Sequence, residues 1–226
     1  MGLRKTIFGR SKQKREAIFE FNANNPLCYS PGNSYFTDLA TGIVSTIYGG
    51  ADYLDKGLRF DGIDDYSRGL GYYFYDYKNS MTIEVYFKMP TIGNGYREIL
   101  SYQSNNFGST GFRIQRNGNL LQFTVGAKAD YSTSIRLTAD TYYFISFTIT
   151  AFTETNCLLK LYLNGIYQRE FIITMQFPNG LDRFLLANSQ NNRYCDLIMR
   201  YARVSYNKSF SASEILNNYN TVISQF

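Results

Sequence analysis

The sequence has no histidine and no tryptophan among its 226 residues. Histidine is the commonest general base in enzymes and the commonest metal ligand in proteins. Its absence excludes Ser-His-Asp triads, Cys-His dyads and zinc sites that are built on histidine. Acid–base or metal chemistry in this chain would therefore depend mainly on carboxylates and other oxygen groups.

Cysteine is scarce as well. Cys28, Cys157 and Cys195 stand far apart and form no Cys-x-x-Cys pair, so the sequence indicates neither a zinc site nor a dense disulfide framework. Isolated cysteines of this kind are typically small core residues. A disulfide between Cys157 and Cys195 stays an alternative, because late strands of a sandwich can be neighbours and only their geometry decides.

Long apolar runs are missing. No stretch approaches the ~20 apolar residues that a membrane-spanning helix needs. The basic start of the chain is followed by an uncharged segment of only four residues, 6–9, which is too short for the apolar part of a signal peptide. We therefore predict a protein that is made in the cytoplasm, with no signal peptide and no transmembrane segment.

Positive charge is concentrated at the N-terminus. Six of the 23 basic residues lie in the first fifteen positions, where no acidic residue occurs, and the other 17 are nearly balanced by 18 acidic residues. Such a segment is typical of a solvated tail or of an arm that docks on an acidic surface. We interpret it as a docking arm with the contact residues Arg4, Lys5, Phe8, Arg10, Lys12, Lys14 and Arg15. The near-neutral body predicts no specific nucleic-acid partner.

Aromatic residues are abundant, with 21 tyrosines and 18 phenylalanines. From Leu58 to Tyr206 they recur in short segments that are separated by turn signals, a pattern that indicates many β-strands. Two Asn-Gly pairs, at Asn117 and Asn164, are typical hairpin turns. The alternating helical patterns of parallel α/β folds are missing, so we predict a two-sheet antiparallel sandwich.

Helices are predicted only near the two ends. Ser211 and Glu214 have the spacing of a capping box, and the flanking Phe210 and Ile215 have the spacing of a hydrophobic staple. They predict one short C-terminal helix. The pattern of residues 11–21 also predicts a short helix, which would use Ile18, Phe19 and Phe21 as apolar anchors.

Several segments fall in an order that is typical of one family. Residues 57–66 have the form of an opening strand pair, residues 81–88 that of the next strand, and the Asn164 hairpin precedes a late strand and the Ser-x-x-Glu-Ile segment that ends at Ile215. This series resembles the laminin-G-like, concanavalin A-like jelly-roll family. The resemblance spans about residues 57–219 and departs from the family in its lack of tryptophan.

The resemblance implies the fold class and the division of the chain. We predict an all-β, two-sheet antiparallel jelly-roll sandwich with a short C-terminal helix and an extended basic N-terminal arm. The predicted parts are the docking arm at residues 1–21, a loop-rich lead-in with an edge strand at residues 22–56, and the laminin-G-like domain at residues 57–226.

Catalysis is not predicted, although the concanavalin A-like fold also hosts glycosidases. Such enzymes need two carboxylates that face each other across the cleaved bond, and the glucanases of this fold supply them from a dense Glu-x-Asp-x-x-Glu strand. Here Glu84, Glu98, Glu154 and Glu170 stand singly. We therefore assign no catalytic residue, and a glycan-cleaving enzyme with an unusual carboxylate pair is the third of our alternatives.

Sugar binding asks for aromatic rings and polar groups at a rim, and two segments offer both. One is the aromatic run of residues 72–77 and the other is the polar loop of residues 188–194. A neighbouring chain that covers the aromatic run, or an ordinary connecting loop, would explain them equally. The candidate carbohydrate-binding residues are Tyr72, Tyr75, Asp76, Asn188, Asn191, Asn192, Arg193 and Tyr194.

Calcium is the one cofactor that the resemblance allows. Some laminin-G-like domains bind it at the sandwich rim, and Asp61, Asp64, Asp65 and Asp196 lie in matching regions. Because turn geometry alone explains an aspartate before glycine at Asp61, we predict no metal and no cofactor, with calcium as the alternative.

The leaderless chain, its basic arm and its resemblance to lectin-like modules on phage surfaces favour one functional prediction. We expect a non-catalytic, carbohydrate-binding structural protein of a virus or bacteriophage particle. The arm would dock many copies onto other virion proteins at the capsid or tail surface, and the domain would serve decoration or host attachment. The main alternative is a structural clamp between coat or tail subunits without a glycan ligand.

Overall fold

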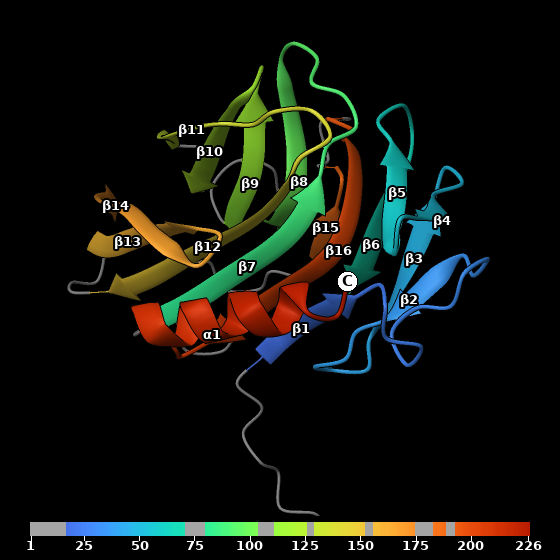
Figure 1. The fold of residues 1–226 in the computed structure, drawn as a ribbon, viewed down its shortest axis with the longest axis horizontal. Helices are drawn as coiled ribbons and strands as arrows, with labels where there is room; N and C mark the ends of the chain where they lie inside the picture. Colours follow the sequence, from blue (N-terminus) through green and yellow to red (C-terminus); the bar gives the residue numbers. More distant parts are fainter. Residues whose placement is uncertain are drawn as a thin grey trace, which may run out of the picture.

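The structure is a computed structural model in which two antiparallel sheets pack face to face (Figure 1). One helix, α1 (Ala212–Ile223), lies across the outer side of the first sheet. The predicted all-β jelly-roll sandwich with a short C-terminal helix is confirmed. The described residues are 17–70, 80–103, 111–125, 129–151, 156–174, 183–188 and 193–226.

The first sheet, sheet A, has the order β14-β13-β12-β7-β16-β5-β4, and β1 pairs with the second half of β16. Neighbours in the sheet are often distant in the chain, as in other jelly rolls. The strands are β1 (Ala17–Asn22), β4 (Asp52–Leu54), β5 (Gly57–Asp61), β7 (Ser80–Lys88), β12 (Tyr142–Ala151), β13 (Asn156–Leu163), β14 (Ile166–Thr174) and β16 (Asp196–Tyr206).

The second sheet, sheet B, has the order β11-β10-β9-β8-β15-β6-β3-β2. Four strands that precede Gly57 therefore contribute to the sandwich, β2 and β3 to sheet B and β1 and β4 to sheet A. The strands of sheet B are β2 (Tyr35–Thr37), β3 (Val44–Tyr48), β6 (Tyr66–Leu70), β8 (Tyr96–Gln103), β9 (Gly111–Asn117), β10 (Leu120–Val125), β11 (Ala129–Arg136) and β15 (Arg183–Leu186).

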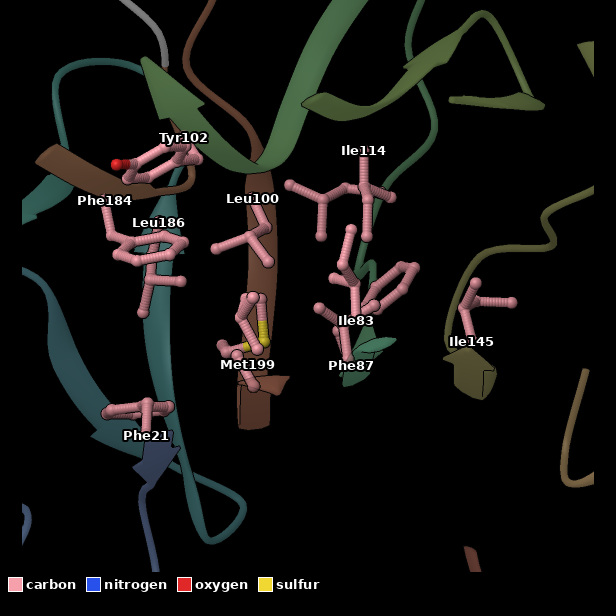
Figure 2. Close-up of a cluster of buried hydrophobic side chains, with 14 of the residues drawn as sticks. Phe21, Ile83, Phe87, Leu100, Tyr102, Ile114, Ile145, Phe184, Leu186 and Met199 are labelled. Atoms are coloured by element: carbon pink, nitrogen blue, oxygen red, sulfur yellow. The ribbon is translucent and has the colours of Figure 1, made fainter. Parts of the chain in front are cut away.

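The core lies between the sheets and is rich in phenylalanine. Phe123 of sheet B contacts Phe147 of sheet A, with ring centroids 4.7 Å apart. Figure 2 shows Tyr102 beside Phe184, whose ring centroids lie 4.6 Å apart. Aromatic pairs of this kind contribute about 0.5–1.5 kcal/mol beyond the burial of their area, which explains why the sequence contains so many phenylalanines.

Both Asn-Gly pairs lie at two-residue hairpin turns, but only Asn164-Gly165 supplies both turn residues. Asn164 and Gly165 have φ angles of 50° and 79°, which is the pattern of a type I′ turn. In the other hairpin Asn117 pairs with Leu120, so the two turn residues are Gly118 and Asn119. Only Gly118 has a positive φ, 57°, as a type II′ turn requires.

The C-terminal helix begins as its sequence predicts. The Ser211 hydroxyl accepts a hydrogen bond from the Glu214 amide, and the Glu214 carboxylate accepts one from the Ser211 amide. Phe210 and Ile215 pack together with Tyr162, which confirms the capping box and the staple. No helix in the described part of the chain combines the length and apolar composition that crossing a membrane requires.

The helix predicted for residues 11–21 is wrong where the structure describes it. Residues 17–22 form β1, in which Phe19 and Phe21 are fully buried. Side chains two positions apart point to the same side only in a strand, and β16 offers its edge for pairing. Residues 11–16 and all seven predicted contact residues of the arm lie outside the described residues.

All three cysteines are free and buried, so the Cys157–Cys195 disulfide does not form. Burial raises the pKa of the Cys157 thiol to about 11. Since the thiolate is the reactive form, a thiol with this pKa stays protonated and inert at neutral pH. The cysteines are small core residues, as their isolation in the sequence predicts.

Candidate functional site

The outer face of sheet B carries a row of aligned side chains, most of them polar. Residues two positions apart along a strand share a face, and the inward positions hold core residues such as Phe112, Ile114 and Phe123. The intervening residues therefore point away from the core. Strand pairing aligns them across six strands as Arg68, Leu185, Ser101, Arg113, Thr124 and Asp130.

Two glutamines link the far end of this face into one hydrogen-bonded network. Gln115 pairs with Gln122, and its Nε2 lies 3.3 Å from the Gln122 Oε1. The same Nε2 donates to Asp130 Oδ1 over 3.1 Å, and the Thr124 hydroxyl donates to that oxygen over 2.6 Å. The network fixes polar side chains in a layer directly above the core.

Glu98 is the fully buried carboxylate of this face. Its Oε1 lies 3.4 Å from Arg113 Nη1 and 3.6 Å from Arg193 Nη1. Arg193 also donates to Gln115 Oε1 over 3.3 Å, and its carbonyl accepts the Glu98 amide over 3.1 Å. Backbone and side chain thus hold the Arg193 guanidinium in one place, and its fork of donors is preorganised.

Three tyrosines follow at the other end of the face, and we call Tyr48, Tyr66 and Tyr194 the tyrosine ladder. Tyr48 and Tyr66 stack with centroids 4.6 Å apart, and Tyr194 follows at 6.0 Å from Tyr66. Arg68 donates to the Tyr48 hydroxyl over 3.2 Å. Burial raises the pKa of Tyr66, so its hydroxyl remains protonated and able to donate at neutral pH.

Arg193 belongs to the polar network, and the tyrosine ladder ends at the next residue of the chain, Tyr194. The Arg193 guanidinium carbon lies 4.9 Å from the centroid of the Tyr96 ring, and its side chain is 31% exposed. Glu98 and Gln115, which lie against Arg193, are inaccessible to solvent. A ligand would therefore contact Arg193 and the edges of the ladder, while these two buried side chains keep Arg193 in position.

Two of the eight predicted sugar-binding residues, Arg193 and Tyr194, lie at this face. Asn188 is buried, and its backbone carbonyl accepts a hydrogen bond of 3.0 Å from the Ser101 hydroxyl. The other five predicted residues lie outside the described residues; they are Tyr72, Tyr75, Asp76, Asn191 and Asn192.

The sequence prediction missed Tyr48, Tyr66 and Arg68. Tyr66 and Arg68 alternate with the inward Ser67 and Gly69 along β6, so their shared face could have been predicted. Their partnership with Tyr48 depends on the pairing of β3 with β6. No local pattern in the sequence indicates that pairing.

Three of the four glutamates that the sequence analysis considered for catalysis are separated by the fold, and the fourth, Glu154, lies outside the described residues. Glu84 points outward from sheet A, where it contacts Arg203 and Asn218. Glu98 points outward from sheet B, on the opposite side of the sandwich, and Glu170 lies on the edge strand β14. The core between the sheets therefore prevents Glu84 and Glu98 from facing each other.

Asp61, Asp64 and Asp65 do come together, since their carboxylate oxygens lie within 4.8 Å of one another. Asp65 accepts the Asp61 amide over 2.9 Å, and Asp61 accepts the Ile63 amide over 2.8 Å. These bonds shape the turn after β5 and leave further carboxylate oxygens, so this donor set fits calcium. Asp196, the fourth candidate, instead accepts the Thr91 hydroxyl over 2.6 Å.

Charge repulsion within this aspartate cluster predicts a stabilising substitution. Burial, and then the neighbouring carboxylates, raise the pKa of Asp65 above its ordinary value. The folded protein therefore favours the protonated form of Asp65, and its stability falls as the pH rises and this carboxyl group becomes charged. Like charges about 5 Å apart repel by about 1 kcal/mol even in water. We therefore expect Asp65→Asn to raise stability by about 0.5–1 kcal/mol at pH 7 without metal, and the gain to vanish below pH ~4.

Thermal unfolding of both proteins in a chelator at the two pH values checks this prediction. Asp64→Asn, which changes an exposed member of the same cluster, is the matched control. A destabilised Asp65→Asn protein at pH 7 would contradict it. In calcium chloride, a rise in Tm that only the unchanged protein shows would mean that the cluster holds the ion.

Comparison with known families places this fold among lectin-like domains. The laminin-G model of the concanavalin A-like lectin/glucanases superfamily matches residues 72–216. These residues include the whole of sheet B from β8 onward and most of sheet A. A comparison with curated protein sequences gave no match.

Solved structures with a similar fold include a sialidase from Trypanosoma rangeli, with a TM-score of 0.68 and 12% identity over 88% of this chain and 32% of the sialidase. Another is a botulinum neurotoxin type C structure described by its interaction with two ganglioside molecules, with a TM-score of 0.65 and 13% identity over 92% and 51% of the two chains. This chain thus spans about a third to a half of these proteins, and the likeness shows the fold alone.

Proposed function

Because the chain belongs to the concanavalin A-like lectin/glucanases superfamily, we propose that it is a non-catalytic module that binds carbohydrate on the outer face of sheet B. The observation that carries this proposal is the fixed position of Arg193 beside the tyrosine ladder. Sugar rings present hydroxyl groups and apolar C–H surfaces together, so their sites combine oriented donors with aromatic rings. The similar neurotoxin structure was described by its ganglioside interaction, which supports this choice of ligand class.

The groups of the face divide into two roles. Arg193, Tyr66 and Tyr194 are half-buried and would meet the ligand, with the guanidinium donating to sugar oxygens. Glu98 and Gln115 are fully buried and would hold Arg193 in its place. Losing a positioning residue should therefore weaken binding indirectly, through disorder of Arg193.

The same geometry argues against hydrolysis. Retaining and inverting glycosidases use a protonated carboxylic acid and a second carboxylate that faces it across the bond. Glu98 is instead inaccessible to solvent and lies within 3.6 Å of two guanidinium groups, so its partners are arginines and not a second carboxyl group. A carboxyl group without access to the ligand cannot protonate a glycosidic oxygen, so the glycan-cleaving alternative ranks below binding.

Binding is tested with a glycan array of the full chain, followed by Kd measurements with the strongest glycan. We expect Tyr66→Ala and Arg193→Ala each to weaken binding about 10- to 100-fold, as expected for the loss of a hydrogen bond to a charged group or of an aromatic contact. Tyr167→Ala and Arg169→Ala are matched controls, because both residues are exposed on β14 of the other sheet. They should leave the Kd unchanged.

Two results would contradict this function. One is a folded wild-type protein that binds no glycan on the array, and the other is unchanged affinity in both sheet B variants. The first result would favour the structural clamp, and the second would mean that glycan binds elsewhere on the protein. The structural clamp is supported by edge strand β14, where Ile166 is 64% and Ile172 is 70% exposed, because exposed apolar edge strands invite pairing with another chain.

The proposal also includes a role in assembly, in which the basic N-terminal arm docks the protein onto a virus or bacteriophage particle. It is supported by the charge of the first fifteen residues and stays a prediction. Since β1 begins at Ala17, the test is deletion of residues 1–16 and not of residues 1–20. Loss of incorporation by a deleted protein that still folds and still binds glycan would support docking, and normal incorporation would contradict it.

A further inference from the structure

A pocket lies at the side of the sandwich, away from the face that carries Arg193. It has a volume of about 500 Å³, within the range of small-ligand sites. Ile47 of β3 and Tyr53 of β4 contribute to its lining, so it lies between the two sheets near the end of the sandwich that β2 and β4 form. Residues 29–34 and 50–53 provide its two walls.

The first wall is a rigid turn. Residues 30–33 read Ser-Pro-Gly-Asn, with Gly32 at a φ of 90° and the Asn33 amide donating to the Ser30 carbonyl over 3.1 Å. Proline followed by a glycine at positive φ is the signature of a type II turn. No atom lies within 4 Å of the position that a Cβ of Gly32 would take, so the turn borders open space.

The second wall follows β3 through two glycines at positive φ. At Gly49 a Cβ would lie 2.5 Å from Asp65 Oδ1, whereas at Gly50 it would meet nothing within 4 Å. The first glycine thus allows close packing, and the second stands open beside the pocket. The chain then enters β4, which places Asp52 and Tyr53 in the lining.

The lining contains a buried hydroxyl that the described structure leaves without a hydrogen bond. Tyr29 is only 3% exposed, and its hydroxyl makes no hydrogen bond of good geometry among the described residues. The Gly32 amide lies near enough to interact with the hydroxyl oxygen, but an amide is a donor and leaves the hydroxyl proton without an acceptor. Buried polar groups are almost always satisfied, so an exception calls for an explanation such as a water or a ligand. Its ring lies 6.0 Å from that of Tyr53, at an interplanar angle of 29°.

The other lining groups define the ligand by their chemistry. Asp52 offers an exposed carboxylate, Asn33 an amide and Ser34 a hydroxyl, while Tyr53 and Ile47 offer apolar surface. In the lining that the structure describes, Asp52 carries the single charge. A carboxylate accepts hydrogen bonds from hydroxyl groups and repels anions, so an acidic ligand is disfavoured.

We propose that this pocket is a second carbohydrate site, which binds a single neutral sugar ring. Asp52 and Asn33 would bind its hydroxyl groups, Tyr53 would contact its C–H face, and Tyr29 would donate its unsatisfied hydroxyl proton to a ring substituent. The site shares no residue with the face of sheet B. Its existence therefore does not depend on the function proposed for that face.

The test is a titration of the full ¹⁵N-labelled chain with the methyl glycosides of glucose, galactose, mannose and N-acetylglucosamine, followed by amide chemical shifts. We expect at least one glycoside to shift the signals of Gly32, Gly50 and Asp52, with a Kd on the order of 1 mM as befits so small a ligand. Tyr29→Phe and Asp52→Asn should each raise that Kd about tenfold or more, because the first removes a hydroxyl donor and the second replaces a charged acceptor oxygen by an amide donor.

Three controls make the result specific. Tyr35→Phe and Asp64→Asn change an exposed tyrosine and an exposed aspartate outside the lining, and neither should alter the Kd. Tyr66→Ala should also leave the titration unchanged, which separates this pocket from sheet B. The proposal is overturned if no glycoside shifts the amide signals of Gly32, Gly50 and Asp52 in the folded protein. It is likewise overturned if the shifts persist unchanged in the Tyr29→Phe and Asp52→Asn variants. It is also overturned if a lysine amide shifts these signals and no glycoside does, since the pocket would then fit a basic side chain.

Discussion

Replacing Glu84 by alanine is expected to lower the free energy of unfolding by about 3–5 kcal/mol, because it strands a largely buried guanidinium without its carboxylate. Glu84 is fully buried on the outer side of sheet A, beneath α1. Arg203 Nε donates to its Oε2 over 2.9 Å, and Asn218 of α1 donates to its Oε1 over 3.0 Å. The carboxylate thus joins β7, β16 and the helix.

Burying the Glu84–Arg203 ion pair costs free energy, because both charged groups lose contact with water. Burial raises the pKa of Glu84, while Arg203 and Asn218 oppose the rise. Replacing both partners by apolar residues of similar size removes that cost together with the attraction. The double variant Glu84→Leu/Arg203→Met should therefore stay within about 1.5 kcal/mol of the unchanged protein.

Urea unfolding of the alanine variant, the double variant and the unchanged protein measures both effects, with equal m values as the check for a two-state comparison. Asn218→Ala removes a single hydrogen bond and is the milder control, with an expected loss of about 1 kcal/mol. The explanation fails if Glu84→Ala costs less than Asn218→Ala. It also fails if the double variant is as unstable as the single one.

The second large effect is expected at β1. Phe19→Ala should cost about 3–5 kcal/mol, since it removes a large side chain from a packed core. Phe19 is fully buried, stacks on Phe184 with centroids 4.6 Å apart and meets Phe36 edge to face at 6.4 Å. It therefore ties the N-terminal strand to β15 and β2 of the opposite sheet.

Deletions from the N-terminus locate the edge of the folded unit. Removing residues 1–22 deletes β1 and leaves the edge of β16 from Tyr201 to Ser205 unpaired, so we expect this protein to be unfolded or aggregated. Removing residues 1–16 deletes no described strand and is the matched control. Thermal unfolding followed by circular dichroism distinguishes them. A cooperative transition at the wild-type Tm after removal of residues 1–22 would contradict the role assigned to β1.

The sequence by itself determined the local features of this protein. The Asn164-Gly165 turn follows from φ angles that few other residue pairs adopt, and the start of α1 follows from side chains that satisfy backbone groups three positions away. Alternating aromatic strands determined the fold class for a similar reason. Each of these signals acts within a few residues, so no knowledge of distant partners is needed to read them.

Only the tertiary structure decided that residues 17–22 form a strand, and only it decided which residues make up the candidate sites. Residues 17–21 suit a short helix or a strand, and the choice was made by pairing with β16, which begins at Asp196. The tyrosine ladder brings together three segments that no shared motif connects, and the side pocket is lined by β3 of sheet B and β4 of sheet A. Both depend on strand order in the sandwich, which is set by long-range burial of apolar area and leaves no local mark in the sequence.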